Sequence, residues 1–204
     1  MTLEQFLAFN AVLLAAIASP GPALLMAIQT SLSAGRTAGI SIGAGLGLMA
    51  AAWTLMALLG LGVIFELFPV LYGGAKVIGT AYLLYVACSM WTNASVAVKP
   101  RIKPVGRAVR RGILVNLFNP KSVLFAAAVL VAIFPAGIDF ADSMVIAANH
   151  FLVEIAFYTA LALAMNTQAV ANRYMRAKKF IDRGAAVVLG ALGIRILFRA
   201  DIAP

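Results

Sequence analysis

Two apolar stretches of this chain each contain a proline beside residues that commonly begin helices. The two motifs read Ser19-Pro20-Gly21-Pro22 and Asn116-Leu117-Phe118-Asn119-Pro120-Lys121. Proline within a helix removes one backbone hydrogen bond and displaces the carbonyl four residues earlier, here that of Ala16 or Asn116. Because Ser and Asn are good N-caps and proline suits the first helical position, each motif predicts the start of a half-helix.

Composition places these motifs in a membrane. Of the 204 residues, 63% are hydrophobic and 11% are charged, and the mean hydropathy is +0.99. A soluble domain has about a quarter of its residues charged, and a membrane span needs about 20 apolar residues. We expect an all-α integral membrane protein with six transmembrane helices over residues 6–28, 39–64, 70–90, 112–134, 144–165 and 184–197. A helix broken inside a bilayer is tolerated only where protein covers it or it lines a wet cavity.

The net charge of +9 is distributed unevenly. Basic residues gather at Arg36 and in segments 99–111 and 173–183, which six spans place on one side of the membrane. The other side carries the acidic residues Glu4, Glu66, Asp139, Asp142 and Asp201. By the positive-inside rule the basic loops are cytoplasmic and both termini are periplasmic. Nucleic acid is excluded as a partner, because its recognition needs a basic face with aromatic or groove-reading residues.

The two halves of the chain resemble each other. Ser19-Pro20 opens a half-helix in the first span and Asn119-Pro120 opens one in the fourth, and similarly spaced glycine pairs occur at 73/79 and 184/190. Three spans per half make the halves antiparallel, as in inverted-repeat transporters, although both prolines fall toward the inner side. We expect two inverted three-helix repeats, residues 1–95 and 112–204, joined by a basic cytoplasmic loop at 96–111. Helices one and four would be broken at Pro20 and Pro120.

Glycine recurs at four-residue intervals at the start of the second expected span, at positions 35, 39, 43 and 47. This spacing puts the glycines on one helical face, where the missing side chains let another backbone approach closely. Helix packing is the favoured interpretation, and direct contact with a ligand is the alternative.

Ionisable side chains inside a bilayer are costly, so each is a candidate functional residue. At about 1.5 Å per residue, Lys121 and Glu154 lie near the middle of a hydrocarbon core about 30 Å thick. His150, Glu154 and Tyr158 follow one another at four-residue spacing and share one helical face. Two interpretations stay open: a Lys121–Glu154 ion pair that only fixes packing, and a substrate or proton role. For His150, an interfacial position is favoured over a proton relay.

A further motif, Gly79-Thr80-Ala81-Tyr82-Leu83, lies in the third expected span. Together with the two proline motifs and the glycine-rich second span, it resembles the LysE/RhtB family of amino-acid exporters over nearly the whole chain. The resemblance implies a small six-span carrier of the bacterial inner membrane that exports amino acids or close derivatives. It also implies coupling to the proton gradient and a homodimer. Two positions depart from the family pattern: Ala23 stands where Asn is common, and Leu48 where an acidic residue is common.

A zwitterionic amino acid suits the two half-helix starts on physical grounds. Free N–H groups and the helix dipole can hold its carboxylate at the ends of these half-helices. The candidate substrate-binding residues are Ser19, Pro20, Gly21, Pro22, Asn116, Asn119, Pro120 and Lys121. The ammonium group needs either the freed carbonyls of Ala16 and Asn116 or the carboxylate of Glu154.

Coupling to protons is assigned to the same helical face as Glu154. We hypothesise that Glu154 pairs with Lys121 in the empty site, that the substrate carboxylate displaces it, and that Glu154 then takes up a proton. His150 and Tyr158 complete the candidate proton-coupling group.

Three other classes of protein fit the sequence less well. A membrane enzyme needs a convergent nucleophile, base or metal ligands, which one His and one Cys do not supply. A non-transporting scaffold explains the hydrophobicity and the glycines but not two aligned helix breaks. An exporter of a small inorganic ion such as cadmium is a closer alternative, yet soft metals favour thiolates or clustered carboxylates. Cys88 is the single cysteine and gives no disulfide framework or metal cluster. We therefore expect no enzymatic activity, cofactor or bound metal.

Overall fold

A computed structural model describes residues 1–67, 107–134, 138–165 and 167–198, with further positions between residues 74 and 94. Those positions are 74, 77, 80, 81, 84, 85, 87–89, 91, 92 and 94. The described part of the chain is helical and contains no strand, so the all-α prediction is confirmed there. Most of the expected third span (70–90), its glycines 73 and 79, and most of the expected loop at 96–111 lie outside the described residues.

The first helix ends at the first proline motif. Helix α1 (Leu3–Ala18) begins with a capping box, in which Gln5 N donates to Thr2 Oγ1 (3.2 Å) and Thr2 N donates to Gln5 Oε1 (2.8 Å). The chain leaves the helix at Ser19, whose backbone is extended, and α2 (Pro22–Leu67) begins after Gly21. Pro22 suits this start because its missing N–H has no helical partner at that position.

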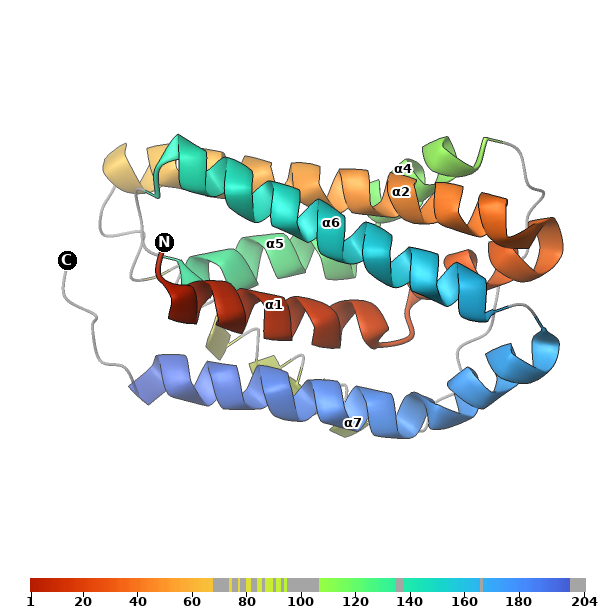
Figure 1. The fold of residues 1–204 in the computed structure, drawn as a ribbon. Coiled ribbons are helices and arrows are strands. Elements are labelled where there is room, and N and C mark those ends of the chain that lie inside the picture. The colour runs from red at the N-terminus through yellow and green to blue at the C-terminus, as the bar shows by residue number, and fades with distance from the viewer. Residues whose placement is uncertain are drawn as a thin grey trace.

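Helix α2 contains a turn that the sequence did not predict. Gly35 has φ 84° and ψ 175°, a backbone conformation that L side chains rarely adopt, so the chain reverses there (Figure 1). A short helix of residues 22–34 precedes the turn, and a long one of residues 36–67 returns beside α6. Gly35 therefore makes a turn and does not belong to the expected packing face.

The second proline motif separates α4 (Ala108–Leu117) from α5 (Pro120–Ile133), and the two helices are bent by 68° at this break. Asn119 is the N-cap of α5. Arg110 and Arg111, expected in the loop at 96–111, lie in the first turn of α4.

The last two helices begin earlier than hydropathy predicts. Helix α6 (Phe140–Ala164) starts before the expected residue 144, because Asp139 caps it by accepting from Asp142 N (2.6 Å). Helix α7 (Gln168–Phe198) starts before the expected residue 184 and includes the basic segment 173–183. The expectation of a loop at 173–183 is wrong. Helix α7 runs through this segment and buries one face, made of Lys178, Asp182, Ala185, Ala186 and Leu189.

The glycine face of α2 packs closely against α6, as predicted. A Cβ atom at Gly43 would lie 2.4 Å from Tyr158 Cβ, and one at Gly47 would lie 3.2 Å from Glu154 Cβ. Gly45 faces α4 instead, where an added Cβ would lie 2.0 Å from the Val109 carbonyl oxygen. Helix α2 is therefore held between α6 and α4, and the glycines bring the α6 face that carries Tyr158 and Glu154 against it.

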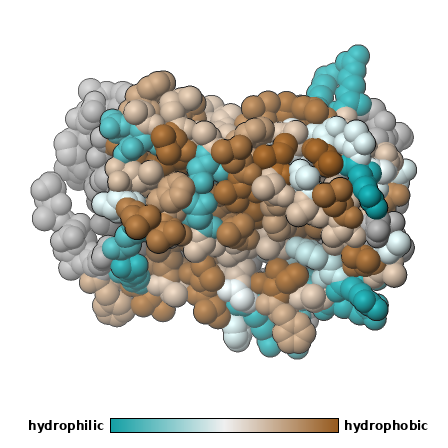
Figure 2. All heavy atoms as spheres, in the orientation of Figure 1, coloured by the Kyte–Doolittle hydropathy of each residue, from teal (hydrophilic) through white to brown (hydrophobic). Residues whose placement is uncertain are grey.

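The described surface suits a bilayer. Helices α2 and α6 are each long and apolar enough to cross a membrane, and the bent pair α4–α5 is a third candidate. Hydrophobic residues cover most of the face in Figure 2, and large apolar side chains such as Leu7 and Leu152 are exposed. Apolar surface on this scale on a soluble monomer is uncommon, whereas lipid tails cover it at no cost.

Charges separate between the two ends of the helix bundle. The start of α1, the start of α6 and the end of α7 lie together at one end in Figure 1. There the Met1 ammonium pairs with Asp142, and Arg195 pairs with Glu4. The turn at Gly35 and the starts of α4 and α7 lie at the opposite end, where most of the described arginines are found.

Candidate functional site

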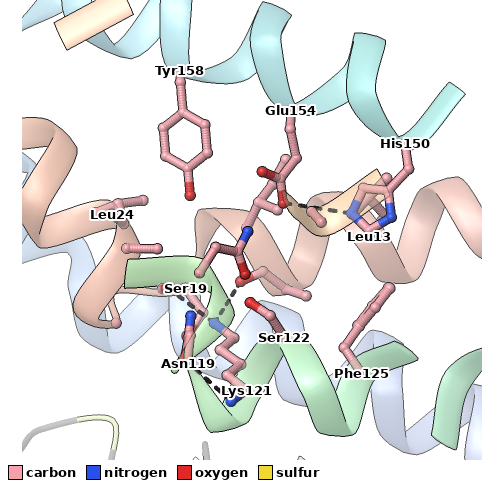
Figure 3. Close-up of a pocket in the computed structure, with 16 residues that line it drawn as sticks. Leu13, Ser19, Leu24, Asn119, Lys121, Ser122, Phe125, His150, Glu154 and Tyr158 are labelled. Atoms are coloured by element: carbon pink, nitrogen blue, oxygen red, sulfur yellow. Dashed lines mark hydrogen bonds and ion pairs between the residues drawn. The ribbon is translucent and has the colours of Figure 1, made fainter. Parts of the chain in front are cut away.

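A cavity lies where the two helix breaks meet the buried face of α6 (Figure 3). Its volume is about 50 Å³, and one water needs about 10–15 Å³ on the same scale. Eight of the eleven candidate site residues line it: Ser19, Gly21, Asn116, Asn119, Lys121, His150, Glu154 and Tyr158. Pro20 and Pro22 are not among its lining residues. Pro20 lies in the first break, and Pro22 and Pro120 begin α2 and α5.

Lys121 binds the end of α1. Its Nζ donates to the carbonyl oxygens of Ala16 (2.6 Å) and Ser19 (3.2 Å). The last carbonyls of a helix have no intrahelical partner, and the negative end of the dipole favours a cation. The carbonyl of Ala16, predicted to be freed by Pro20, is thus bound by the protein itself.

The hypothesis of a Lys121–Glu154 ion pair is wrong for this structure. The two side chains line one cavity, but no ion pair joins them within the described ranges. The physical reason is that α1 ends beside Lys121 and supplies two backbone acceptors. Glu154 instead lies 3.5 Å from His150 Nε2, measured from its Oε1 atom.

The two half-helix starts differ in their free donors. In the first turn of α5, Lys121 N donates to Asn119 Oδ1 (3.2 Å), and Ser122 N and Val123 N donate to the Asn119 carbonyl. In the first turn of α2, Leu25 N donates to the Gly21 carbonyl (3.0 Å), whereas the N–H groups of Ala23 and Leu24 have no acceptor in the described part of the chain. Both residues line the cavity, so its open donors belong to α2.

The α6 face carries His150, Glu154 and Tyr158 into the cavity wall, all of them buried. Thr54 Oγ1 lies 2.7 Å from His150 Nδ1, and the rings of Phe9 and Phe125 pack edge-on against the imidazole. His150 is therefore buried between helices, where the glycine face of α2 meets α6, and its depth in the membrane stays a prediction.

Two buried acceptors on the cavity wall have no donor within the described residues. They are Oε2 of Glu154 and Oδ1 of Asn116. Asn116 is held by its other atoms, because its Nδ2 donates to the Leu46 carbonyl (2.6 Å) and its own carbonyl accepts from Asn119 N (3.1 Å). Buried acceptors without donors are rare and destabilising. A ligand that brings N–H donors would satisfy both.

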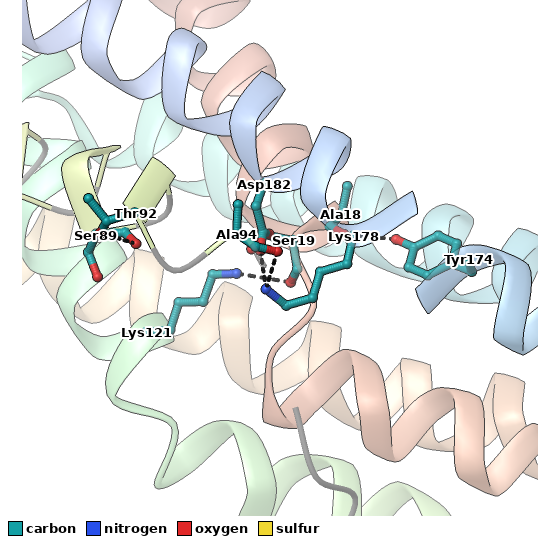
Figure 4. A network of polar contacts seen from close by, with 9 residues as sticks. All are labelled: Ala18, Ser19, Ser89, Thr92, Ala94, Lys121, Tyr174, Lys178 and Asp182. Atoms are coloured by element: carbon teal, nitrogen blue, oxygen red, sulfur yellow. Dashed lines mark hydrogen bonds and ion pairs between the residues drawn. The ribbon is translucent and has the colours of Figure 1, made fainter. Parts of the chain in front are cut away.

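A polar network on α7 supports the first break, and the sequence analysis missed it (Figure 4). Ser19 Oγ donates to Asp182 Oδ1 (2.7 Å), Lys178 Nζ donates to Asp182 Oδ2 (2.5 Å), and Tyr174 Oη donates to the Ala18 carbonyl (2.8 Å). Lys178 and Asp182 are both buried. The available signal was the four-residue spacing of positions 174, 178 and 182 inside the basic segment.

Tyr174 lies outside the expected spans and acts as a fixed donor. Burial, aided by the negative charge of Asp182, raises the pKa of Tyr174 to about 12. The phenol therefore stays protonated at neutral pH and keeps donating to the end of α1.

Comparisons with known proteins cover almost the whole chain. The model of the LysE type translocator family matches residues 14–200. The uncharacterized membrane protein YahN of Escherichia coli K12 is 27% identical over 185 residues, 88% of this chain and 83% of its own. The threonine efflux protein of Salmonella typhi is 28% identical over an alignment that covers 89% of this chain and 92% of that protein. The homoserine/homoserine lactone efflux protein of Salmonella typhimurium is 26% identical over an alignment that covers 79% of this chain and 81% of that protein. No solved structure matches this chain.

Proposed function

Because this chain belongs to the LysE family of translocators, we propose that it exports small neutral amino acids across the bacterial inner membrane. One observation carries the proposal. The cavity has open N–H donors at the start of α2 and open acceptors at Glu154 and Asn116. An amino acid carries a carboxylate and an ammonium group on one carbon, so it can satisfy both ends at once.

The substrate carboxylate is assigned to the start of α2. A helix N-terminus with unused N–H groups is an anion site, since the amides of Ala23 and Leu24 and the positive end of the dipole act together. Lys121 adds a cation beside this end. Two of its three N–H bonds are used by α1, which leaves one for the substrate.

The ammonium group is assigned to Glu154 and Asn116. The Ala16 and Asn116 carbonyls, which were the other candidates, already accept hydrogen bonds from Lys121 and Asn119. The remaining acceptors are the carboxylate oxygen Glu154 Oε2 and the amide oxygen Asn116 Oδ1. A charge-assisted bond to a carboxylate is roughly twice as strong as a neutral one, so Glu154 contributes most to this end.

The substrate side chain is expected to be neutral. Apolar residues such as Leu13, Ile17 and Phe125 form the rest of the wall, and Ser122 offers one hydroxyl. Glu154 is the one acidic residue among the described lining residues, so a second, cationic group would find no carboxylate there. Relatives named threonine efflux protein and homoserine/homoserine lactone efflux protein agree with a small uncharged side chain.

Proton coupling follows from competition for one atom. A proton on Glu154 Oε2 occupies the position that the substrate ammonium needs, so the carrier binds either a proton or a substrate molecule at this atom. His150 fixes the second oxygen of Glu154, and Tyr158 lies one turn further along α6. Alternating access would then exchange an outgoing amino acid for an incoming proton.

The architecture we propose has six spans in two inverted repeats, with helices one and four broken at Pro20 and Pro120. The separation of charge between the bundle ends supports a cytoplasmic basic end and periplasmic termini. A reporter that is active only in the cytoplasm, fused after Pro204, should stay silent, and a strong signal would contradict this orientation. The homodimer is proposed on the family resemblance alone.

The experiment that tests the function is counterflow in proteoliposomes. Unlabelled amino acids are screened for exchange with labelled threonine, followed by two matched analogues of the best substrate, its N-acetyl derivative and its amide. The first lacks the ammonium group and the second lacks the carboxylate, so neither should exchange. Exchange of either analogue at the rate of the amino acid would contradict the two-ended site. Uptake of cadmium instead of any amino acid would establish the inorganic-ion alternative.

A further inference from the structure

Three carbonyls at the end of α1 accept hydrogen bonds from side chains in the second half of the chain. Lys121 Nζ binds the carbonyl oxygens of Ala16 and Ser19, and Tyr174 Oη binds that of Ala18. These partners lie 105, 102 and 156 residues away in sequence. Three carbonyl acceptors thus lie at the break, and the Lys121 ammonium group binds two of them.

This arrangement has the chemistry of a cation site. The carbonyls at a helix C-terminus carry the negative end of the dipole, and half-helix C-termini coordinate small cations in transporters. Asp182 lies immediately behind and accepts from Ser19 Oγ (2.7 Å), which adds a full negative charge next to the carbonyls. Asp182 is itself balanced by Lys178 and does not contact Lys121.

The chain makes room for the lysine to reach this position. Lys121 starts in the first turn of α5 and passes beside Gly21, where an added Cβ would lie 3.9 Å from Lys121 Cδ. No carboxylate within the described residues forms an ion pair with Lys121. Its ammonium group is therefore held by backbone oxygens, which can also bind a free ammonium, alkylammonium or alkali ion.

We propose that the end of α1 is a binding site for a monovalent cation, and that the Lys121 ammonium group fills it from within the chain. The side chain replaces the free ion that such a helix end would otherwise need, so the protein requires no sodium. Lys121 ties α1 to α5 across the two breaks. Its part in transport, though not its part in binding, rests on the proposed function.

The test is chemical rescue. In Lys121→Ala the missing atoms correspond to n-propylammonium, which can enter the vacated space and bind the same carbonyls. The matched control is Lys121→Met, which removes the charge but fills the space. N-methylglucamine at equal ionic strength controls for salt, because it is too large to enter. The thermal midpoint of the purified protein in detergent is measured first, since it needs no substrate, and counterflow is measured second.

Without added cation, Lys121→Ala should have a lower midpoint than the parent and counterflow reduced about tenfold or more. n-Propylammonium should raise both in a saturable manner, and sodium should do so more weakly. Neither cation should affect the parent or Lys121→Met. Equal effects of n-propylammonium on all three proteins, or parental behaviour of Lys121→Ala in N-methylglucamine, would overturn the proposal.

A further variant decides the case in which Lys121→Ala does not fold. Lys121→Gln keeps a donor for the Ala16 carbonyl but carries no charge. It should be less stable than the parent, and parental stability would show that the site does not need a cation. The two proposals fail separately. A parent that exchanges no amino acid would refute the proposed function, while the stability measurements would still decide whether α1 ends in a cation site.

Discussion

The two helix breaks are similar in sequence but differ in how the protein holds them. At the second break, Asn119 accepts from the backbone N–H groups of the next few residues, and its own N–H donates to the Asn116 carbonyl. At the first break, the carbonyls of α1 are bound by residues more than 100 positions away, and the first N–H groups of α2 have no acceptor in the described ranges.

This difference separates a break held by local contacts from one held by tertiary contacts. A helix break whose backbone groups are hydrogen-bonded by neighbouring residues forms as soon as that short segment has folded. A helix break whose backbone groups are hydrogen-bonded by distant residues depends on tertiary contacts, which can rearrange while the helices on either side stay intact. The open N–H donors and the distant side chains that bind the helix-end carbonyls both belong to the first break. We therefore expect conformational change to centre on residues 16–24, while the second break holds Asn116 and Lys121 in fixed positions for the substrate.

The buried pair on α7 should give the largest effect, because breaking it leaves a buried charge without its counter-ion beside the first break. Asp182→Ala leaves Lys178 buried without its carboxylate and removes the acceptor of Ser19 Oγ. Breaking a buried ion pair costs about 3–5 kcal/mol of stability, whereas replacing both partners by apolar groups is often tolerated. Unfolding in detergent should therefore show Asp182→Ala far below the parent and the double variant Asp182→Leu/Lys178→Met much closer to it. Equal loss in the single and double variants would contradict this role.

The wall opposite the first break should be sensitive to added volume. Gly43→Ala places a methyl group 2.4 Å from Tyr158 Cβ, so α2 and α6 must move apart. Overpacking of this kind costs about 1–3 kcal/mol. Gly60→Ala is the matched control, because an added Cβ there meets nothing within 4 Å. Removal of a helical glycine should stabilise that variant by about 0.5–1 kcal/mol. Thermal unfolding of the two variants should shift in opposite directions, and a common direction would show that the close approach is not decisive.

Matched changes at the breaks themselves sharpen the comparison. Asn119→Ala loses the N-cap of α5, which costs about 0.5–2 kcal/mol, and Asn119→Asp should restore it. Ser19→Ala loses one hydrogen bond to a carboxylate, worth about 1.5–3 kcal/mol when buried but less where Lys178 still pairs with Asp182. The variants should differ in function: Ser19→Ala should raise the substrate KM in counterflow, and Asn119→Asp should not. Equal KM values for Ser19→Ala and the parent would place the first break outside the binding site.

The smallest effect is expected far from both breaks. Arg195 and Glu4 pair at the end of the bundle with about half of each side chain exposed. Surface pairs contribute about 0–1 kcal/mol, and salt screens them. Glu4→Gln should thus leave both the unfolding midpoint and counterflow near parental values, with any difference disappearing at high salt. A loss comparable to that of Asp182→Ala would contradict the assignment of stability to the centre of the bundle.

Local chemistry made the break positions predictable, and long-range chemistry did not. Proline geometry and capping are decided within a few residues, so the ends of α1 and α4 and the starts of α2 and α5 fall at the predicted motifs. The glycine face and the α6 face were predictable for the same reason, since spacing alone fixes which residues share a helix side. Most candidate site residues therefore line the cavity.

The errors have one physical origin. Side-chain charges suggested that Lys121 would pair with Glu154, but its partner is the end of α1. A backbone carbonyl can accept from any donor nearby, so the residue types in a sequence do not reveal it as a partner. Hydropathy suggested a loop at 173–183, although a helix can bury Lys178 and Asp182 when they neutralise each other. Both cases required knowledge of which distant elements meet. Six spans and inverted repeats stay predictions.

The most direct test of the central claim is the pH dependence of amino-acid binding to purified protein, parent against Glu154→Gln. A proton and the substrate ammonium compete for Glu154, so the apparent Kd of the parent should rise as pH falls, by up to about tenfold per unit where the carboxylate is protonated in the empty site. Glu154→Gln should bind more weakly, and its Kd should not change over the same range. A pH-independent Kd in the parent, or the same pH dependence in Glu154→Gln, would contradict the assignment of the ammonium group and the coupling proton to one carboxylate.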